Sequence, residues 1–285
     1  MGRVGIVTDS TACIPPDIVS ELGIEVIPLY LAFGEQVYQD GMAVSAAEFY
    51  ETLRTAKQPP TTSAPAPGVY AEAILRAAEG ADAVVCATVS RQFSAMYESA
   101  TQGAALVKEQ APNLDVRVLD SGAAAMAQGF VVIEAARAAQ AGASIDQVLA
   151  RAEALMPGVQ LVVILDTLTY LARSGRVPRL VVWASSPLQL KVVVEFQQAK
   201  YRPVAIVRTK PRALERLLHA LRERTGGRPL HVCVHHTNVP QEAGALAEQV
   251  RSTLQPEELF VREFTQVMGT HTGPGLLGFA FYTDP

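Results

Sequence analysis

Four short stretches rich in hydroxyl side chains divide the sequence, and three of them directly follow or close a run of β-branched apolar residues. They are residues 8–11, 61–63, 90–94 and 120–121. A fifth polar turn, residues 269–275, contains His271. In an open parallel sheet, the turns after the strands gather at one edge, where ligands bind. We therefore expect a pocket of neutral hydrogen-bond donors with one histidine, suited to orienting an anion.

Each stretch also has a simpler interpretation as a helix cap. Ser, Thr and Asp are the preferred N-cap residues, and a strand–helix unit needs one after its strand. The excess of hydroxyls favours a binding role, because residues 61–63 offer three where one cap would do. Ser90 and Ser94 would share one face if both lie on the entry to a helix. Asp9 and Asp120 end their strands in the same way, and either could orient hydroxyls or act as a cap.

Composition limits the classes of function. The chain has 285 residues, of which 49% are apolar and 18% charged, so it can form a substantial core. A net charge of −4 argues against general nucleic-acid binding. Three widely spaced cysteines indicate reduced thiols. With no apolar leader and no membrane-spanning run, we expect a cytoplasmic protein that is not an integral membrane protein.

Strands and helices alternate in the first half of the sequence, which predicts βαβ units and a mostly parallel sheet. We expect strands at 4–8, 24–33, 83–89 and 116–119. We expect a helix that residues 15–17 open and that runs through 22, and further helices at 46–55, 69–78, 94–110, from about 123, and 145–156. Pro157 and Gly158 then form the best candidate boundary. The sequence thus predicts an N-terminal α/β domain, residues 1–157, and a mixed α/β C-terminal domain, residues 158–285.

The second half contains several further strand-like runs. We expect strands at 159–165, 188–196, 203–207, 230–234, 259–264 and 276–282, and helices at 211–224 and 243–254. The polar turn between the second and third of these strands favours an antiparallel pair. Basic residues concentrate between Arg173 and Arg212, which predicts a solvated face or a surface for an acidic partner or a phosphate.

The familiar nucleotide and hydrolase motifs are missing from the sequence, since it has neither a P-loop nor a glycine-rich dinucleotide fingerprint nor a nucleophile elbow. As an ordered set, other motifs resemble those of the DegV family of fatty-acid-binding proteins over nearly the whole chain. These motifs are Val7-Thr8-Asp9-Ser10-Thr11, Val26-Ile27-Pro28-Leu29, Tyr38-Gln39-Asp40-Gly41, Thr62-Ser63-Ala64-Pro65, Leu119-Asp120-Ser121, Leu168-Thr169-Tyr170-Leu171, Ser174-Gly175-Arg176 and Thr270-His271-Thr272-Gly273-Pro274-Gly275.

The resemblance implies a two-domain α/β fold that holds a long-chain fatty acid, such as palmitate or stearate, in an apolar tunnel between the domains. It places the carboxylate on Thr62, Ser94 and His271, and it implies no catalytic residue, metal or cofactor. A separate fatty acid kinase is the implied partner, and Arg173 and Arg176 are candidates to contact it or the phosphoryl group. Candidate supporting residues around the head group are Asp9, Ser10, Ser63, Ser90, Asp120 and Ser121.

Two positions depart from the family pattern. Ser94-Ala95-Met96 replaces Ser-Gly-Thr, which adds a methyl group near the head group and removes a hydroxyl, and Val192 follows Lys191 where the family tends to have proline. Two other functions remain open from the residues alone. One is a hydrolase or transferase with Ser94 as nucleophile and His271 as base. The other is a protein that binds a small phosphorylated metabolite.

Overall fold

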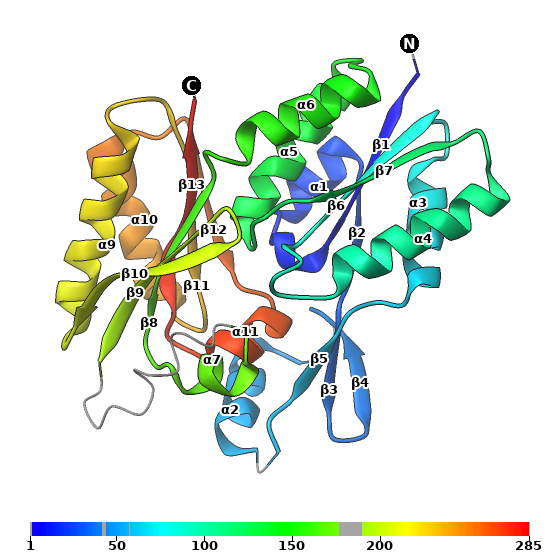
Figure 1. Cartoon of the computed structure of the whole chain (residues 1–285). Helices are drawn as coiled ribbons and strands as arrows, with labels where there is room; N and C mark the ends of the chain where they lie inside the picture. Colours follow the sequence, from blue (N-terminus) through cyan, green and yellow to red (C-terminus); the bar gives the residue numbers. More distant parts are fainter. Residues whose placement is uncertain (1, 42–43, 57, 177–189, 285) are drawn as a thin grey trace. The chain divides into compact units, whose positions relative to one another are not determined.

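The computed structural model describes residues 2–41, 44–56, 58–176 and 190–284 (Figure 1). No helix in these ranges is both long and apolar enough to cross a membrane. The chain forms two compact units: unit 1 comprises Met1–Tyr30 and Ser63–Gly158, and unit 2 comprises Leu31–Thr62 and Val159–Pro285. The two contiguous domains predicted from the sequence, 1–157 and 158–285, are a different way of dividing the chain and stay a prediction.

Unit 1 contains, among its described residues, a parallel four-stranded sheet in the order β2-β1-β6-β7. Every residue of β6 is buried, which is typical of a parallel strand covered on both faces. The parallel sheet predicted from the alternating pattern is therefore confirmed. Its strands are β1 (Val4–Asp9), β2 (Ile24–Ile27), β6 (Ala83–Thr88) and β7 (Asp115–Asp120).

Helices cover both faces of this sheet (Figure 1). Helices α3 (Pro67–Ala77) and α4 (Met96–Gln110) pack against each other, while α5 (Met126–Gln140) packs on α1 (Pro16–Leu22), β1 and α6 (Ile145–Leu155). The alanine-rich α5 is buried along most of its length, so it serves as a core helix. A short 3-10 turn, η1 (Ser10–Ala12), directly follows β1.

The order of the strands gives unit 1 a topological switch point. The chain passes from β1 to β2 on one side, and later enters β6 on the other side of β1. Loops that leave two such strands diverge, and open α/β sheets bind ligands outside the carboxyl ends of the strands at this point. The loops in question carry Asp9 and Ser10 after β1, and Ser90 and Ser94 after β6.

Unit 2 contains a mixed six-stranded sheet in the part of the chain that the structure describes, in the order β10-β9-β8-β13-β11-β12. The strands β9 and β10 are antiparallel, as predicted from the turn between them. Neighbouring strands are antiparallel except β11 and β12. The strands are β8 (Gln160–Leu165), β9 (Lys191–Gln197), β10 (Lys200–Val207), β11 (Leu230–His236), β12 (Glu258–Glu263) and β13 (Leu277–Thr283).

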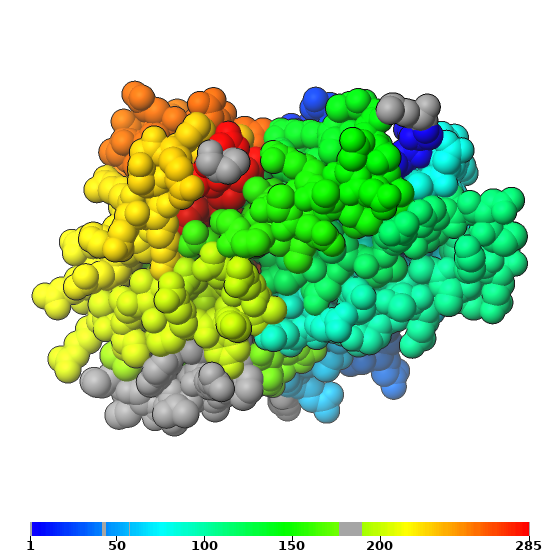
Figure 2. Space-filling model, turned by 45° about the horizontal axis from the view of Figure 1, so that its top comes forward, coloured from blue at the N-terminus to red at the C-terminus, as the bar shows by residue number. Residues whose placement is uncertain are grey.

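Two helices, α9 (Lys210–Thr225) and α10 (Pro240–Leu254), cover one face of this sheet (Figure 1). Buried apolar residues of these helices and of the strands form one hydrophobic core. Leu217 and Leu221 of α9 pack with Phe279 of β13 in that core. The opposite side of α9 faces solvent (Figure 2, yellow).

Smaller elements complete unit 2. The short helix α11 (Gln266–Thr272) packs against α7 (Thr169–Ser174) and α2 (Ala46–Thr55). A small sheet in the order β4-β3-β5 belongs largely to this unit, with β3 at Tyr30–Phe33, β4 at Gln36–Gln39 and β5 at Thr61–Ser63. The single strand expected over residues 24–33 is thus wrong. It divides into β2 and β3 around Pro28, which has no N–H to donate to a ladder.

Candidate functional site

Thr62 and His271 lie in direct contact. Thr62 comes from β5 and His271 from the last turn of α11, and Oγ1 of Thr62 is 2.9 Å from Nε2 of His271. Both residues belong to unit 2, and both are half-buried. Two of the three residues expected to bind a carboxylate are therefore adjacent in space, although they are far apart in the sequence.

His271 lies on a helix, so the polar turn expected over residues 269–275 is wrong for its first half. Helix α11 begins after Thr265, whose hydroxyl accepts a hydrogen bond from the backbone N–H of Met268 at 3.5 Å. Asp40, from a distant segment, accepts another from the N–H of Val267 at 3.1 Å. These caps satisfy donors that a seven-residue helix would otherwise leave without partners.

The threonines on either side of His271 serve the helix. The hydroxyl of Thr270 donates to the carbonyl of Gln266 at 2.9 Å, and that of Thr272 donates to the carbonyl of Met268 at 3.2 Å. Hydroxyl groups that bond to the preceding helical turn have used their single proton. The imidazole of His271 is therefore the polar group that this motif contributes to the site.

The turn after α11 is fixed by close packing. Gly273 has φ +74, and a Cβ atom there would lie 2.1 Å from Cδ2 of Tyr170. The buried hydroxyl of Thr237 donates to the carbonyl of Gly273 at 2.7 Å and accepts from the N–H of Leu276 at 2.9 Å. The end of α11, and with it His271, is thereby held in place.

His271 is neutral at physiological pH. Burial, together with the positive charge of Arg176, lowers the pKa of His271 to about 4. A neutral imidazole carries one N–H donor and one acceptor nitrogen. Because their mutual hydrogen bond uses one of the two polar protons of the pair, one proton is left to donate to an anion.

Arg173 and Arg176 are exposed at the end of α7. Nη1 of Arg176 donates to the carbonyl of Ser174 at 2.7 Å. Its charge contributes to the lowered pKa of His271, so it acts on the Thr62–His271 pair electrostatically. A positive charge beside neutral donors favours an anionic ligand.

In unit 1, Asp9 is a buried anchor for three segments. Its Oδ1 accepts from the N–H of Thr11 at 3.0 Å, and its Oδ2 accepts from the N–H of Val89 at 2.9 Å and from Nε2 of Gln128 at 3.0 Å. Burial raises the pKa of Asp9, and these hydrogen bonds oppose the rise. Asp9 thus joins the turn after β1, the loop after β6 and helix α5.

Three of the serines expected near the head group shape the turns of unit 1 through hydrogen bonds to the backbone. Each accepts a backbone hydrogen bond: Ser10 from Leu29 at 3.3 Å, Ser90 from Gln92 at 3.3 Å and Ser121 from Ala123 at 3.2 Å. Ser63 is exposed at the end of β5. Asp120 is half-buried and pairs with Arg91, with Oδ2 3.1 Å from Nε.

Ser94 differs from these serines. Helix α4 begins at Met96, not at residue 94 as expected, and its N-cap is Ala95, so Ser94 does not cap it. Ser90 and Ser94 do not share a helical face either, because residues 91–93 form a turn. Ser94 is half-buried, and within the described ranges its hydroxyl makes no hydrogen bond. It is available to a ligand.

Sequence reasoning missed several residues that support these groups. Gln128, Thr237 and Asp40 are buried and bond to segments far away in the sequence. A signal existed for Gln128, because an amide within an alanine-rich helix needs a buried partner. Asp40 lies in a motif that carries the family resemblance, but nothing in the sequence indicated that its carboxylate would cap a helix.

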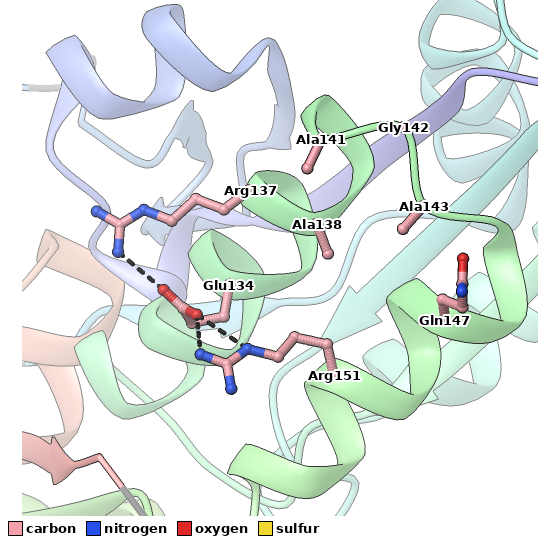
Figure 3. Close-up of a pocket in the computed structure, with 8 residues that line it drawn as sticks. All are labelled: Glu134, Arg137, Ala138, Ala141, Gly142, Ala143, Gln147 and Arg151. Atoms are coloured by element: carbon pink, nitrogen blue, oxygen red, sulfur yellow. Dashed lines mark hydrogen bonds and ion pairs between the residues drawn. The ribbon is translucent and has the colours of Figure 1, made fainter.

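A depression of about 500 Å³ lies over the α5–α6 pair in unit 1 (Figure 3). Among its lining residues, the carboxylate of Glu134 accepts hydrogen bonds from Arg137 at 2.8 Å and from Nε of Arg151 at 3.0 Å. The predicted site residues do not line it. We interpret this cluster as a link between two helices.

A profile of the DegV family, described as uncharacterised protein, matches residues 3–284. The chain belongs to the DegV family. A DegV domain-containing protein of Streptomyces coelicolor is 36% identical over 97% of both chains. Protein DegV of Bacillus subtilis is 30% identical over 98% of this chain and 99% of its own.

Solved structures of DegV proteins share the fold, which confirms the predicted α/β architecture. A DegV family protein from Thermus thermophilus, described by its fatty acid binding, has a TM-score of 0.90 at 31% identity, covering 99% of this chain and 100% of its own. DegV of Bacillus subtilis, described as a fatty acid binding protein, gives 0.88 at 29%, covering 100% of both. A stearic acid-binding protein from Eubacterium ventriosum gives 0.89 at 25%, covering 98% of both.

We predict that Gly273→Ala destabilises the fold by about 2–4 kcal/mol, because it combines backbone strain with a collision against the Tyr170 ring. Gly226→Ala is the control, since Gly226 has φ +57 but open space around it, and it should show the strain alone. Chemical denaturation of both variants measures the difference. Equal losses would contradict the packing of Tyr170 on this turn.

We predict that Glu134→Gln lowers the free energy of unfolding at pH 7 by about 1–3 kcal/mol. Burial alone would raise the pKa of Glu134, but its hydrogen bonds to Arg151 and Arg137 lower the pKa below its ordinary value. The stabilisation is therefore present above pH 4.5 and is lost as the pH falls through the lowered pKa.

Denaturation of both forms between pH 7 and pH 3 tests this expectation, and the gap between wild type and variant should close at the acidic end. Glu248→Gln removes an exposed ion pair with Arg251 and should change little at any pH. A gap that does not depend on pH would argue against an ionic role for Glu134.

Proposed function

We propose that this protein binds a long-chain fatty acid without transforming it, and that Thr62, His271 and Ser94 hold the carboxylate. The contact between Thr62 and His271 carries this proposal, because it presents a half-buried, uncharged donor pair on fixed backbone. Ser94 offers a further hydroxyl that is not used by the described residues of the protein.

The chemistry of these groups suits a carboxylate that must be held and released. A hydrogen bond from a neutral donor to a carboxylate is charge-assisted, yet it lacks the strength and fixed geometry of a bidentate arginine. Most of the affinity would come from the acyl chain, since each buried methylene contributes about 0.8 kcal/mol. The path of that chain in a tunnel between the domains stays a prediction of the family resemblance.

Relatives support the choice of ligand. DegV proteins from Thermus thermophilus and Bacillus subtilis are described as binding fatty acids, and one from Eubacterium ventriosum as binding stearic acid. The first two are 31% and 29% identical to this chain over nearly its whole length. We extend that ligand class to this protein on the basis of the shared fold and the residues described above.

We further propose that the bound fatty acid is presented to a separate cytoplasmic kinase that phosphorylates the carboxylate. Arg173 and Arg176 support this step because they are exposed and cationic, with Arg173 in the last turn of α7, which packs against α11, and Arg176 just after that helix. They would contact the transferred phosphoryl group or an acidic surface of the kinase.

The chemistry of His271 argues against a serine hydrolase. A general base works best with a pKa near the operating pH, and a pKa of about 4 makes this imidazole a weak base. Within the described residues, no carboxylate orients the His271 ring, as one would in a catalytic triad.

We predict that denaturing mass spectrometry of the purified protein detects a long-chain fatty acid, and that the delipidated protein takes up stearate. Thr62→Val should weaken stearate binding about tenfold, because one hydrogen bond to a charged group is lost. Thr61→Val changes the neighbouring exposed residue of β5 and is the matched control.

Reproducible absence of any acyl species, together with no uptake of stearate, would refute the proposed function. Ser94→Ala should likewise weaken binding while leaving the fold intact. An esterase turnover that this variant abolished would instead establish the hydrolase.

We predict that the ring of His271 titrates near pH 4 in the ligand-free protein, as followed by NMR of the imidazole. Bound stearate should raise this midpoint, since a nearby negative charge favours the imidazolium. Because the folded pKa lies below the unfolded value of 6.5, His271 contributes stability above pH 6.5 that is lost as the pH falls toward 4. A midpoint near 6.5 would contradict the buried, neutral histidine.

A further inference from the structure

The position of Ser94 depends on backbone that is held from outside the turn. Its hydroxyl makes no hydrogen bond within the described ranges, and Ala95, the N-cap of α4, has no side chain that could cap the helix. What fixes Ser94 must therefore act on the residues before and after it.

Three successive residues before Ser94 each donate a backbone N–H to a different segment. Val89 donates to Oδ2 of Asp9 at 2.9 Å, Ser90 to the carbonyl of Ala123 at 2.9 Å, and Arg91 to Oδ1 of Asp120 at 3.3 Å. Asp120 ends β7 directly beside Thr88, the last residue of β6, so it lies where this loop begins.

Arg91 also reaches across the turn. Its Nε lies 3.1 Å from Oδ2 of Asp120, and its guanidinium carbon lies 4.0 Å from the ring centroid of Tyr97, in the first turn of α4. Asp120 is itself oriented by the N–H of Gly122, which donates to Oδ1 at 3.0 Å. Asp120, Arg91 and Tyr97 thus form a clasp that spans the turn containing Ser94.

We propose that Asp120 and Arg91 are positioning residues for Ser94, which hold its hydroxyl ready for an anionic head group. This inference rests on the proposed binding of a fatty acid. The ligand is then met by a donor that is already ordered, so binding does not have to order the turn.

The clasp determines the geometry of the turn that contains Ser94 and contributes little to the free energy of folding. The side chain of Arg91 is 50% exposed and that of Asp120 is 23% exposed, and ion pairs at such positions add little to the free energy of folding. A variant that opens the clasp should therefore fold normally and bind stearate less well. Salt should weaken the effect, because exposed charges are screened.

Asp120→Asn is the test, since it keeps the shape of the side chain and removes its charge. We expect stearate affinity to fall about three- to tenfold at low salt, as expected for one or two weakened polar contacts. Binding of 1-octadecanol, which has no carboxylate, should change much less. Asp115→Asn, on the same strand, removes the ion pair with Arg117 away from the turn, so it should leave stearate affinity unchanged.

A double-mutant cycle with Ser94→Ala separates positioning from a general effect on the fold. If Asp120 acts through Ser94, Asp120→Asn should cause almost no further loss of affinity in the Ser94→Ala background. Amide exchange at residues 89–97 should also be faster in Asp120→Asn.

Stearate affinity in Asp120→Asn equal to wild type, or losses that simply add in the double mutant, would overturn the positioning role alone. Failure of the unchanged protein to bind stearate would overturn the proposed function, and this inference with it.

Discussion

A carboxylate buried at the end of a central strand must have donors for its oxygens, because an unpaired charge without water is very costly. Asp9 meets this requirement with donors from the turn after β1, the loop after β6 and helix α5. Each donor belongs to a segment at the switch point of the sheet. The need to satisfy one buried group therefore fixes the loops that the topology marks for ligand binding.

The second unit follows the same logic with different residues. Asp40 caps the start of α11, and Thr237 clamps the turn after it, so the helix that carries His271 is held at both ends. In both units, polar side chains that bond to distant parts of the backbone act as scaffold. The hydroxyl of Ser94 has no hydrogen-bond partner among the described residues, so it can meet a ligand. The partners of a side chain therefore say more about its role than the composition of its stretch does.

The sequence predicts the sheet of unit 1 because buried parallel strands leave a strong local signal, as in the continuous apolar run of β6. It does not predict α11, since the caps that stabilise this short helix come partly from Asp40, 227 positions away. Nor can it separate Asp9 from Ser94, because the partners that satisfy Asp9 lie 80 and 119 positions further along. The pairing of Thr62 with His271 could be expected only from the family resemblance, because nothing local relates two residues 209 positions apart.

The proposed function also explains why the donors are weak. A protein that passes its ligand to another active site must expose the carboxylate without losing the acyl chain. Binding free energy that comes from the buried acyl chain opposes loss of the ligand to water. Binding free energy that comes from contacts to the carboxylate opposes its transfer to the partner. A neutral imidazole and hydroxyl groups keep the binding free energy from the carboxylate small. Because rigid backbone already holds these donors in place, binding loses little conformational entropy in ordering them. Replacing them by a bidentate arginine would raise affinity and would oppose the transfer that the site is proposed to serve.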